Sequence, residues 1–271
     1  MRIFERLAVA GVLVVAACAE GGVPGPEIPQ DPPNPASTIA YPRTAGTARG
    51  RILVDASRDG GVWWFPQYPS FDPTLPHQGL ALADYLRSLA YDVDVLPRPQ
   101  LVTSDLLGDY DLVIRANGFG RYAASEIQAY GSYVSGGGRL LLLGDHMRYA
   151  PPDSLALSFG ITFAGVTRGD NLLDDFAAHP ITQDVVPLYY MVGSAIVGLP
   201  GEAQALGRLS AASYVDLNDN SAQDGNEGSA PVVLAALSFG NGRVVVFGDT
   251  NLWQLVPQPL VGNVLAWLEE D

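Results

Sequence analysis

The sequence contains a single cysteine among 271 residues, and this scarcity excludes several kinds of site. One thiol cannot build a disulfide framework, a cysteine zinc cluster or an iron–sulfur site. Positive charge is also scarce, because 15 lysines and arginines stand against 29 aspartates and glutamates, which gives a formal net charge of −14. A chain of this charge lacks the basic surface that nucleic-acid binding needs, so no nucleic-acid partner is expected.

Charged residues of either sign make up only 16% of the chain, whereas hydrophobic residues make up 48%. This composition predicts a chain that buries a core, not a disordered one. At roughly 100–200 residues per domain, the length allows one large domain or two small ones. The many glycines and prolines, 30 and 21, predict numerous loops.

The amino terminus has the pattern of an export signal. Arg2 and Arg6 precede an apolar run over residues 7–17, which is too short to span a membrane as a mature helix. The run ends at Cys18, and small residues before this sole cysteine resemble a bacterial lipoprotein box. That resemblance implies a lipid-anchored protein of the cell envelope, and the lack of an aspartate after Cys18 favours the outer membrane, facing the periplasm or the surface. An ordinary secretory signal is the alternative.

Residues 19–50 are rich in proline, glycine and small polar residues and show no apolar period. Prolines favour an extended, semi-rigid backbone, so this segment is predicted to be a tether. The sequence thus divides into a signal peptide over 1–18, a tether over 19–50 and a folded domain over 51–271.

Strand and helix patterns alternate from residue 51 onward. Buried strands are predicted over 51–57, 92–96, 111–117 and 139–144, with helices over 79–91 and 125–136, the latter capped by Ser125. Farther along, we expect a short helix over 154–159, strands over 161–164 and 206–217, a hairpin of strands 231–239 and 243–247, and a closing helix over 259–270. This order predicts an α/β, flavodoxin-like open sheet, mostly parallel, with helices on both faces and a C-terminal β-hairpin.

Polar residues follow several predicted strands, and in open α/β sheets ligands bind beyond the carboxyl ends of the strands. The expected crevice is lined by Asp55, Asn117, Asp145, His146 and Asp249. The alternative is that these side chains only cap turns and helices.

Three further residues are expected to reach the same crevice. His77 precedes the first helix, and Trp63 and Trp64 follow the first strand in an aromatic segment. Exposed aromatic side chains serve sugar stacking or protein docking, whereas the alternative is a lid folded onto the core.

Two glycine-led strands and one short turn resemble a known fold. Residues 136–146 (GGGRLLLLGDH) and 240–249 (GNGRVVVFGD) each combine a glycine turn, an apolar strand and polar residues directly after the strand. Residues 179–182 read HPIT. Together they are similar to the non-catalytic branch of the class I glutamine amidotransferase-like superfamily, which includes domains of gliding-motility transporter components and intraflagellar-transport proteins. The resemblance covers about residues 51–268.

The sequence departs from the catalytic members of that superfamily at the point that matters for chemistry. Those enzymes need a cysteine thiolate at the elbow after the strand, where Asp145 and His146 stand in this chain. No Gly-x-Ser-x-Gly motif offers a serine instead. The sequence therefore predicts a lipid-anchored binding or scaffold domain of the cell envelope, needing no cofactor, with an envelope protein or a glycan as ligand. The alternative is an envelope hydrolase that uses Asp145 and His146 with Asp55 or Asp249.

The segment 216–227 is dense in oxygen-bearing side chains. Calcium prefers several carboxylate and carbonyl oxygens in a flexible loop. The candidate ligands are Asp216, Asn218, Asn220, Asp224 and Glu227, although the glycine of an EF-hand loop is missing at the sixth position. A solvated acidic loop without a metal is the alternative.

Overall fold

The computed structural model describes residues 37–43, 46–58, 71–116, 120–146 and 152–270. All of them belong to Asp31–Asp271, the larger of the two units into which the chain divides. The predicted signal peptide, its Cys18 and most of the predicted tether lie outside the described residues. No helix in the described part of the chain is long and apolar enough to cross a membrane.

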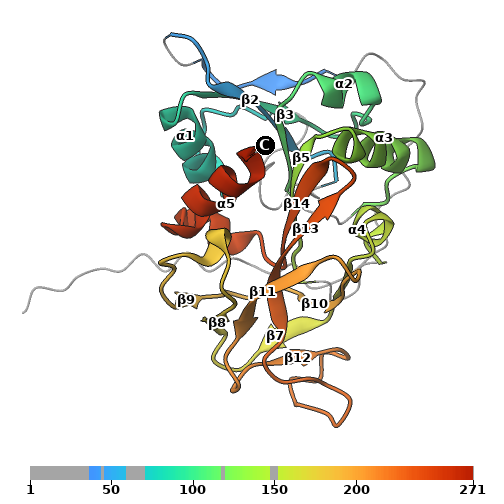
Figure 1. The fold of residues 1–271 in the computed structure, drawn as a ribbon, viewed down its shortest axis with the longest axis vertical. Helices are drawn as coiled ribbons and strands as arrows, with labels where there is room; N and C mark the ends of the chain where they lie inside the picture. Colours follow the sequence, from blue (N-terminus) through green and yellow to red (C-terminus); the bar gives the residue numbers. More distant parts are fainter. Residues whose placement is uncertain (1–36, 44–45, 59–70, 117–119, 147–151, 271) are drawn as a thin grey trace, which may run out of the picture. The chain divides into compact units, whose positions relative to one another are not determined.

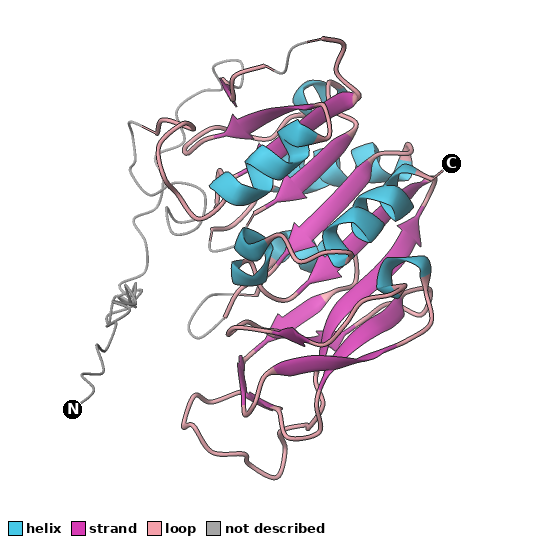
Figure 2. Cartoon of the chain, turned by 90° about the vertical axis from the view of Figure 1, so that its left-hand side faces the viewer, coloured by secondary structure: helices cyan, strands magenta, loops and turns pink. Residues whose placement is uncertain are grey.

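A ten-stranded sheet forms the centre of the domain, in the order β1-β3-β2-β4-β5-β14-β13-β11-β8-β9 (Figures 1 and 2). Five neighbouring strands are parallel: β3 (Tyr91–Leu96), β2 (Gly50–Asp55), β4 (Leu112–Arg115), β5 (Arg139–Leu143) and β14 (Gly242–Phe247). Long apolar runs build these strands because both faces of a parallel sheet are covered. The predicted flavodoxin-like α/β fold is confirmed.

Antiparallel strands extend the parallel part of the sheet on both sides. β1 (Ile39–Ala40) pairs with β3 at one edge. On the other side follow β13 (Val232–Phe239), β11 (Gln204–Leu209), β8 (Leu172–Phe176) and β9 (Leu188–Tyr189). The hairpin of β13 and β14 turns at Gly240, whose φ of 62° suits glycine, as the Gly-Asn-Gly motif predicts.

Helices cover both faces of the sheet, as the sequence predicts. The first face carries α1 (Leu80–Ser88), α5 (Leu260–Glu269) and the 3-10 turns η1 (Pro180–Thr182) and η2 (Asn251–Leu255). The second face carries α2 (Ser104–Gly108), α3 (Ala124–Ser135) and α4 (Ser154–Ser158). Figure 1 shows α1 and α5 on one side of the strands and α2, α3 and α4 on the other.

Side chains of each strand alternate between these two faces, which assigns every strand residue to one of two cores. Ile52 and Val54 of β2 belong to the core under α1 and α5, whereas Leu53 belongs to the core under α3. The same alternation holds along β4, β5 and β14. The face of a polar residue at a strand end is therefore fixed by its position relative to these apolar residues.

Two predicted details differ in the structure. The helix expected from Ser125 begins at Ala124, and the Glu126 side chain accepts the Ala123 N–H at 2.8 Å, so a glutamate replaces the predicted serine cap. The strand expected over 206–217 is divided into β11 and β12 (Tyr214–Asp216). Ser210 and Ser213 both donate to Asp170 Oδ1, at 2.6 and 2.7 Å, and this shared acceptor turns the chain between the two strands.

Two small antiparallel sheets complete the described fold. β6 (Thr162–Ala164) pairs with β10 (Ala195–Gly198), and β7 (Val166–Arg168) pairs with β12. β12 leads directly into the acidic loop over 217–227 (Figure 1).

Candidate functional site

The order of the parallel strands places a switch point between β2 and β4. β2 is the first of these strands along the chain, yet β3 lies on one side of it and β4 on the other. In open α/β sheets, ligands bind at the carboxyl edge where the strand order reverses in this way. Asp55 ends β2 and Arg115 ends β4, and the two are register partners. They are the strand-end residues at the switch point.

Asp55 is wholly buried and its carboxylate accepts four hydrogen bonds. Oδ1 accepts the backbone N–H and the hydroxyl of Ser57, at 2.9 and 2.5 Å. Oδ2 accepts the hydroxyls of Tyr122 and Tyr130, at 2.7 and 2.6 Å. Burial, and next the charge of Asp55, raise the pKa of both tyrosines well above the usual value, so both stay protonated donors. The four bonds occupy the acceptor positions of this carboxylate.

Two buried ion pairs flank Asp55. Arg115 Nη1 lies 2.5 Å from Asp153 Oδ2, and Asp153 also caps α4. Arg58 Nη2 contacts both carboxylate oxygens of Glu126, at 2.9 and 2.7 Å. We call the residues Asp55, Arg58, Arg115, Tyr122, Glu126, Tyr130 and Asp153 the α3-side cluster. Its members come from β2, β4, α3 and the segments next to them, including the residue that caps α4, so it ties the second face of the sheet together.

A separate polar cluster follows β5 and β14. Asp145 is 2% exposed, and its Oδ1 lies 2.6 Å from His146 Nδ1 while its Oδ2 accepts the hydroxyl of the buried Thr250 at 3.0 Å. Ser194 donates its hydroxyl to the backbone carbonyl of Asp145. The imidazole of His146 is the partly exposed group of this cluster.

Asp249 lies beside Asp145 and is wholly buried. Its two carboxylate oxygens accept the backbone N–H groups of Asn251 and Leu252, at 2.9 and 3.2 Å, and so begin η2. Burial, together with the neighbouring charge of Asp145, raises the pKa of Asp249 to about 8. At neutral pH this carboxyl group is therefore mostly protonated. We call Asp145, His146, Ser194, Asp249 and Thr250 the β5-exit cluster.

The structure divides the crevice that the sequence predicts. Asp55 follows Leu53 by two residues and so lies on the α3 face, where it contacts the two tyrosines. Asp145 and Asp249 follow Leu143 and Phe247 by two residues, which assigns them to the opposite face. Asp145, His146 and Asp249 are thus brought together, whereas Asp55 belongs to a different network. Asn117, Trp63 and Trp64 lie outside the described residues.

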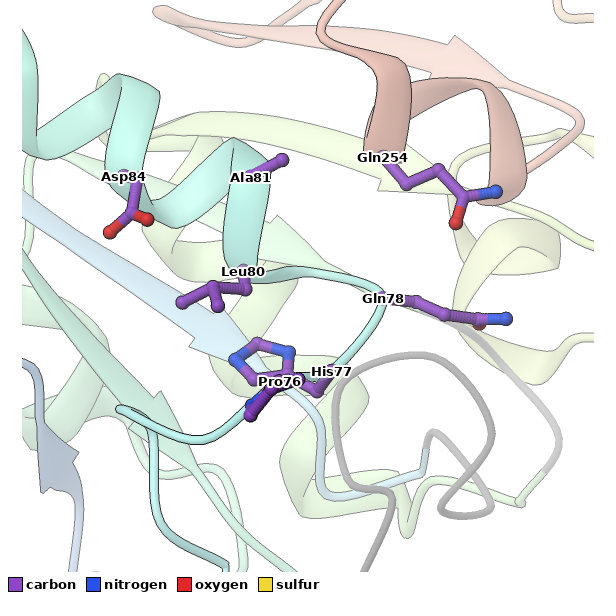
Figure 3. A pocket seen from close by; sticks show the side chains of 7 residues that line it. All are labelled: Pro76, His77, Gln78, Leu80, Ala81, Asp84 and Gln254. Atoms are coloured by element: carbon purple, nitrogen blue, oxygen red, sulfur yellow. The ribbon is translucent and has the colours of Figure 1, made fainter. Parts of the chain in front are cut away.

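His77 lies away from both clusters, on the segment that leads into α1. Its Nε2 is 2.7 Å from the Tyr41 hydroxyl, and its ring meets Phe71 edge-on. Burial lowers its pKa to about 4, so the ring is neutral near pH 7. The ring lines a shallow hollow of about 370 Å³. Figure 3 shows Asp84 on α1 and Gln254 on η2 among the other side chains that line it.

The carboxylates of the loop over 216–227 accept hydrogen bonds from the loop itself and from Arg168 on β7. Asp216 accepts the N–H groups of Asn220 and Ser221 and a bond from Arg168, and Glu227 accepts two backbone N–H groups. Asp224 accepts the side-chain amides of Asn218 and Asn220. Within the described residues, no three histidine, cysteine, aspartate or glutamate side chains gather to hold a metal ion. Calcium binding by this loop stays a prediction, which calorimetric titration with calcium would check.

Sequence reasoning did not identify several residues of the α3-side cluster. Arg115 lies within the strand predicted over 111–117, and Glu126 and Tyr130 lie within the helix predicted over 125–136. No local pattern gives these three, or Tyr122 and Asp153, a role at a site. A signal for Arg115 was present, because a charged residue inside a buried apolar strand needs a partner. No local pattern indicates that Tyr122 and Tyr130 meet Asp55.

Comparison with solved structures agrees with this architecture. No protein-family model matches the sequence, and no curated protein matches it. The chain is similar to the N-terminal domain of mmIFT52, with 16% identity and a TM-score of 0.58 over 82% of this chain and 98% of that domain. A ThuA-like protein from Bacteroides uniformis has 15% identity and a TM-score of 0.51, over 84% of this chain and 95% of its own. A cytoplasmic protein from Salmonella typhimurium has 14% identity and a TM-score of 0.51, over 81% of this chain and 98% of its own. The chain therefore has a glutamine amidotransferase-like, ThuA-like fold.

Proposed function

We propose that this chain is a non-catalytic binding or scaffold domain of glutamine amidotransferase-like fold, held at a membrane of the bacterial cell envelope by a lipid on Cys18. The observation that carries the proposal is the chemistry of the β5 exit. By the resemblance to the amidotransferase-like superfamily, Asp145 or His146 stands where the catalytic members carry their nucleophilic cysteine, and the sole thiol of this chain is at residue 18. Without a thiol at this place, no thioester intermediate can form there.

The hydroxyl groups beside Asp145 do not replace the missing thiol. Thr250 is buried and donates to Asp145 Oδ2, and Ser194 is buried and donates to the Asp145 carbonyl. A serine or threonine nucleophile would instead need its hydroxyl on the basic nitrogen of a histidine. The arrangement supports a domain that recognises a ligand, an envelope protein or a glycan, and does not transform it.

The catalytic alternative rests on one contact, the 2.6 Å approach of Asp145 Oδ1 to His146 Nδ1. A carboxylate in that position orients an imidazole to accept a proton from a bound water, which would then attack the substrate. The two functions are separated by assaying the purified chain for glutaminase and esterase activity. We expect no turnover above the uncatalysed rate. Turnover that disappears in Asp145→Ala, and persists in a control variant such as Asp84→Ala on exposed α1 surface, would overturn the non-catalytic proposal.

The anchor has its own test, because binding and anchoring can fail separately. Cys18→Ser removes the thiol that would carry the lipid, whereas Ala19→Ser changes its neighbour and keeps the thiol. We expect Cys18→Ser to leave the membrane fraction of the host cell and Ala19→Ser to stay in it. Membrane retention of both variants, with unchanged processing, would contradict the anchor.

A further inference from the structure

Two arginines are buried at the carboxyl edge of β2 and β4, and the fold satisfies the hydrogen-bonding groups of only one. Arg58 uses all three nitrogens of its guanidinium group. Its Nε donates to the Arg121 carbonyl at 3.0 Å, its Nη1 to the Ser57 carbonyl at 3.2 Å, and its Nη2 to Glu126. The side chain is also stacked over the Tyr122 ring.

Arg115 is different, although it is 0% exposed. Its Nη1 donates to Asp153, but Nε and Nη2 have no hydrogen-bond acceptor among the described residues. In a guanidinium group, the N–H bonds of Nε and Nη2 point the same way and form a planar fork for two acceptor lone pairs. In Arg115, Nε and Nη2 therefore form a fork of two donors to which no described residue bonds.

Such a fork is costly to leave empty, because buried N–H groups without an acceptor lose their hydration without compensation. The neighbouring carboxylate does not fill it. Asp55 is the register partner of Arg115, but Ser57, Tyr122 and Tyr130 already occupy its acceptor positions. No acceptor among the described residues fills the fork, so a bound ligand or a water would satisfy it.

The position of the fork also indicates a ligand. Arg115 is the last residue of β4, at the switch point where α/β sheets receive their ligands. It lies two residues beyond Val113, which belongs to the core under α3, and its ion-pair partner Asp153 caps α4. A ligand on the fork would therefore lie beyond the ends of β2 and β4.

The charges around the fork select the kind of acceptor. The α3-side cluster holds three carboxylates, on Asp55, Glu126 and Asp153, but only two guanidinium groups. Asp153 and Glu126 neutralise the two arginines through ion pairs, which leaves Asp55 as the uncompensated charge. An anionic ligand would add a second negative charge at short range in a poorly solvated place. A neutral oxygen acceptor avoids that repulsion.

We propose that Arg115 anchors a ligand-binding site at the switch point, which takes a neutral ligand through an oxygen acceptor, either a carbonyl or a pair of neighbouring hydroxyls, on Nε and Nη2. The inference rests on the proposed binding function and gives it a ligand chemistry. It also separates the binding site from Asp145 and His146, which lie beyond a different strand on the opposite face.

The test follows the Nε–H signals of arginine in proton–nitrogen correlation spectra of the intact domain. Arg115→Lys keeps a positive charge opposite Asp153 but lacks the fork, so its missing signal identifies Arg115. If that variant does not fold, Asp153→Asn serves, because it alters the group bonded to Nη1 and shifts the same signal. Acetamide, glycerol and acetate are the probes, and the Arg58 signal is the internal control, since its donors are all engaged.

We expect the Arg115 signal to move and saturate with acetamide or with glycerol, while the Arg58 signal stays in place. Response to acetamide alone identifies a carbonyl ligand, and response to glycerol alone identifies hydroxyls. Acetate should bind at least about tenfold more weakly than the better neutral probe because of the repulsion from Asp55. Preferential binding of acetate would overturn the neutral-ligand inference. No response to any probe would overturn the site, because a trapped water would then satisfy the fork.

Failure of the inference and failure of the proposed function give different results. If no probe binds and no turnover occurs, only the Arg115 site is wrong. If acetamide binds at Arg115 and releases ammonia, the site is supported and the non-catalytic function is wrong.

Discussion

The Tyr130 hydroxyl, on α3, donates a 2.6 Å hydrogen bond to Asp55 Oδ2 at the end of β2. Both residues are wholly buried, and Tyr122 donates to the same oxygen at 2.7 Å. The rings of Tyr122 and Tyr130 meet edge-on, at 89°. A helix and a strand are thus joined through a charged group that water does not reach, and the orientation of α3 on the sheet depends on it.

Loss of the Tyr130 hydroxyl should destabilise the domain. Tyr130→Phe removes one donor from a buried carboxylate and should lower the free energy of unfolding by about 1.5–3 kcal/mol. Tyr133→Phe is the matched control on the same helix, because the Tyr133 hydroxyl makes only long bonds of 3.2–3.3 Å to backbone groups. Urea unfolding of both variants measures the difference, and equal losses would contradict a special role for Asp55.

Removal of Arg58 should cost more than removal of an arginine that is partly exposed. Arg58→Met leaves Glu126 buried and unpaired, which should lower the free energy of unfolding by about 3–5 kcal/mol. Arg87→Met, which breaks the exposed pair with Asp84, should cost at most about 1 kcal/mol. Chemical unfolding measures both. A loss for Arg58→Met no larger than for Arg87→Met would show that the buried pair contributes little.

Asp249 should make the domain less stable as pH rises from about 4 to about 8. Its pKa is raised from 3.8 to about 8 in the folded state, so across this range the folded chain holds a proton that the unfolded chain has released. The stabilisation from that proton is complete below pH 3.8 and is lost as pH approaches 8. Asp249→Asn cannot titrate, so its stability relative to the wild type should increase across the same range. A pH-independent difference between the two proteins would contradict the raised pKa.

His77 should make the domain less stable as pH falls from about 6.5 to about 4, the opposite pH dependence to that of Asp249. Burial lowers its pKa from 6.5 to about 4, so between these values the unfolded chain binds a proton that the folded chain does not. The contribution of His77 to stability is present above pH 6.5 and is lost as pH falls toward 4. His77→Gln keeps a group that can hydrogen-bond the Tyr41 hydroxyl but does not titrate. Thermal melts at pH 7 and pH 4.5 should therefore show a smaller loss on acidification for the variant than for the wild type.

Local patterns in the sequence were sufficient for the elements of the parallel sheet. The apolar runs over 51–57 and 139–144 become β2 and β5, and Gly240-Asn241-Gly242 becomes the turn of a hairpin. Each of these depends on neighbours along the chain, which a sequence shows directly. Short strands such as β7, with three residues, carry too few side chains for a period to be visible.

The candidate site was predicted only in part because its geometry depends on register between strands. The sequence indicates that Asp55 and Asp145 both follow buried strands, but Asp55 lies two residues past Leu53 and Asp145 two past Leu143, which belong to opposite cores. Which apolar residue faces which helix is decided by packing across the sheet. The partners of Asp55 come from residues 67 and 75 positions away, a separation that no motif spans.

The place of β14 in the sheet determines when the domain can fold. β14 comes near the end of the chain, yet it lies inside the sheet, paired with β5 on one side and β13 on the other. Until residues 242–247 have left the ribosome, the N–H and C=O groups of β5 face an empty position where another chain can pair. A nascent or prematurely terminated chain therefore carries an open edge at its centre, and such fragments should aggregate or require a chaperone. Folding of the sheet is therefore complete only when β14, which is made after β5 and β13, takes its place between them.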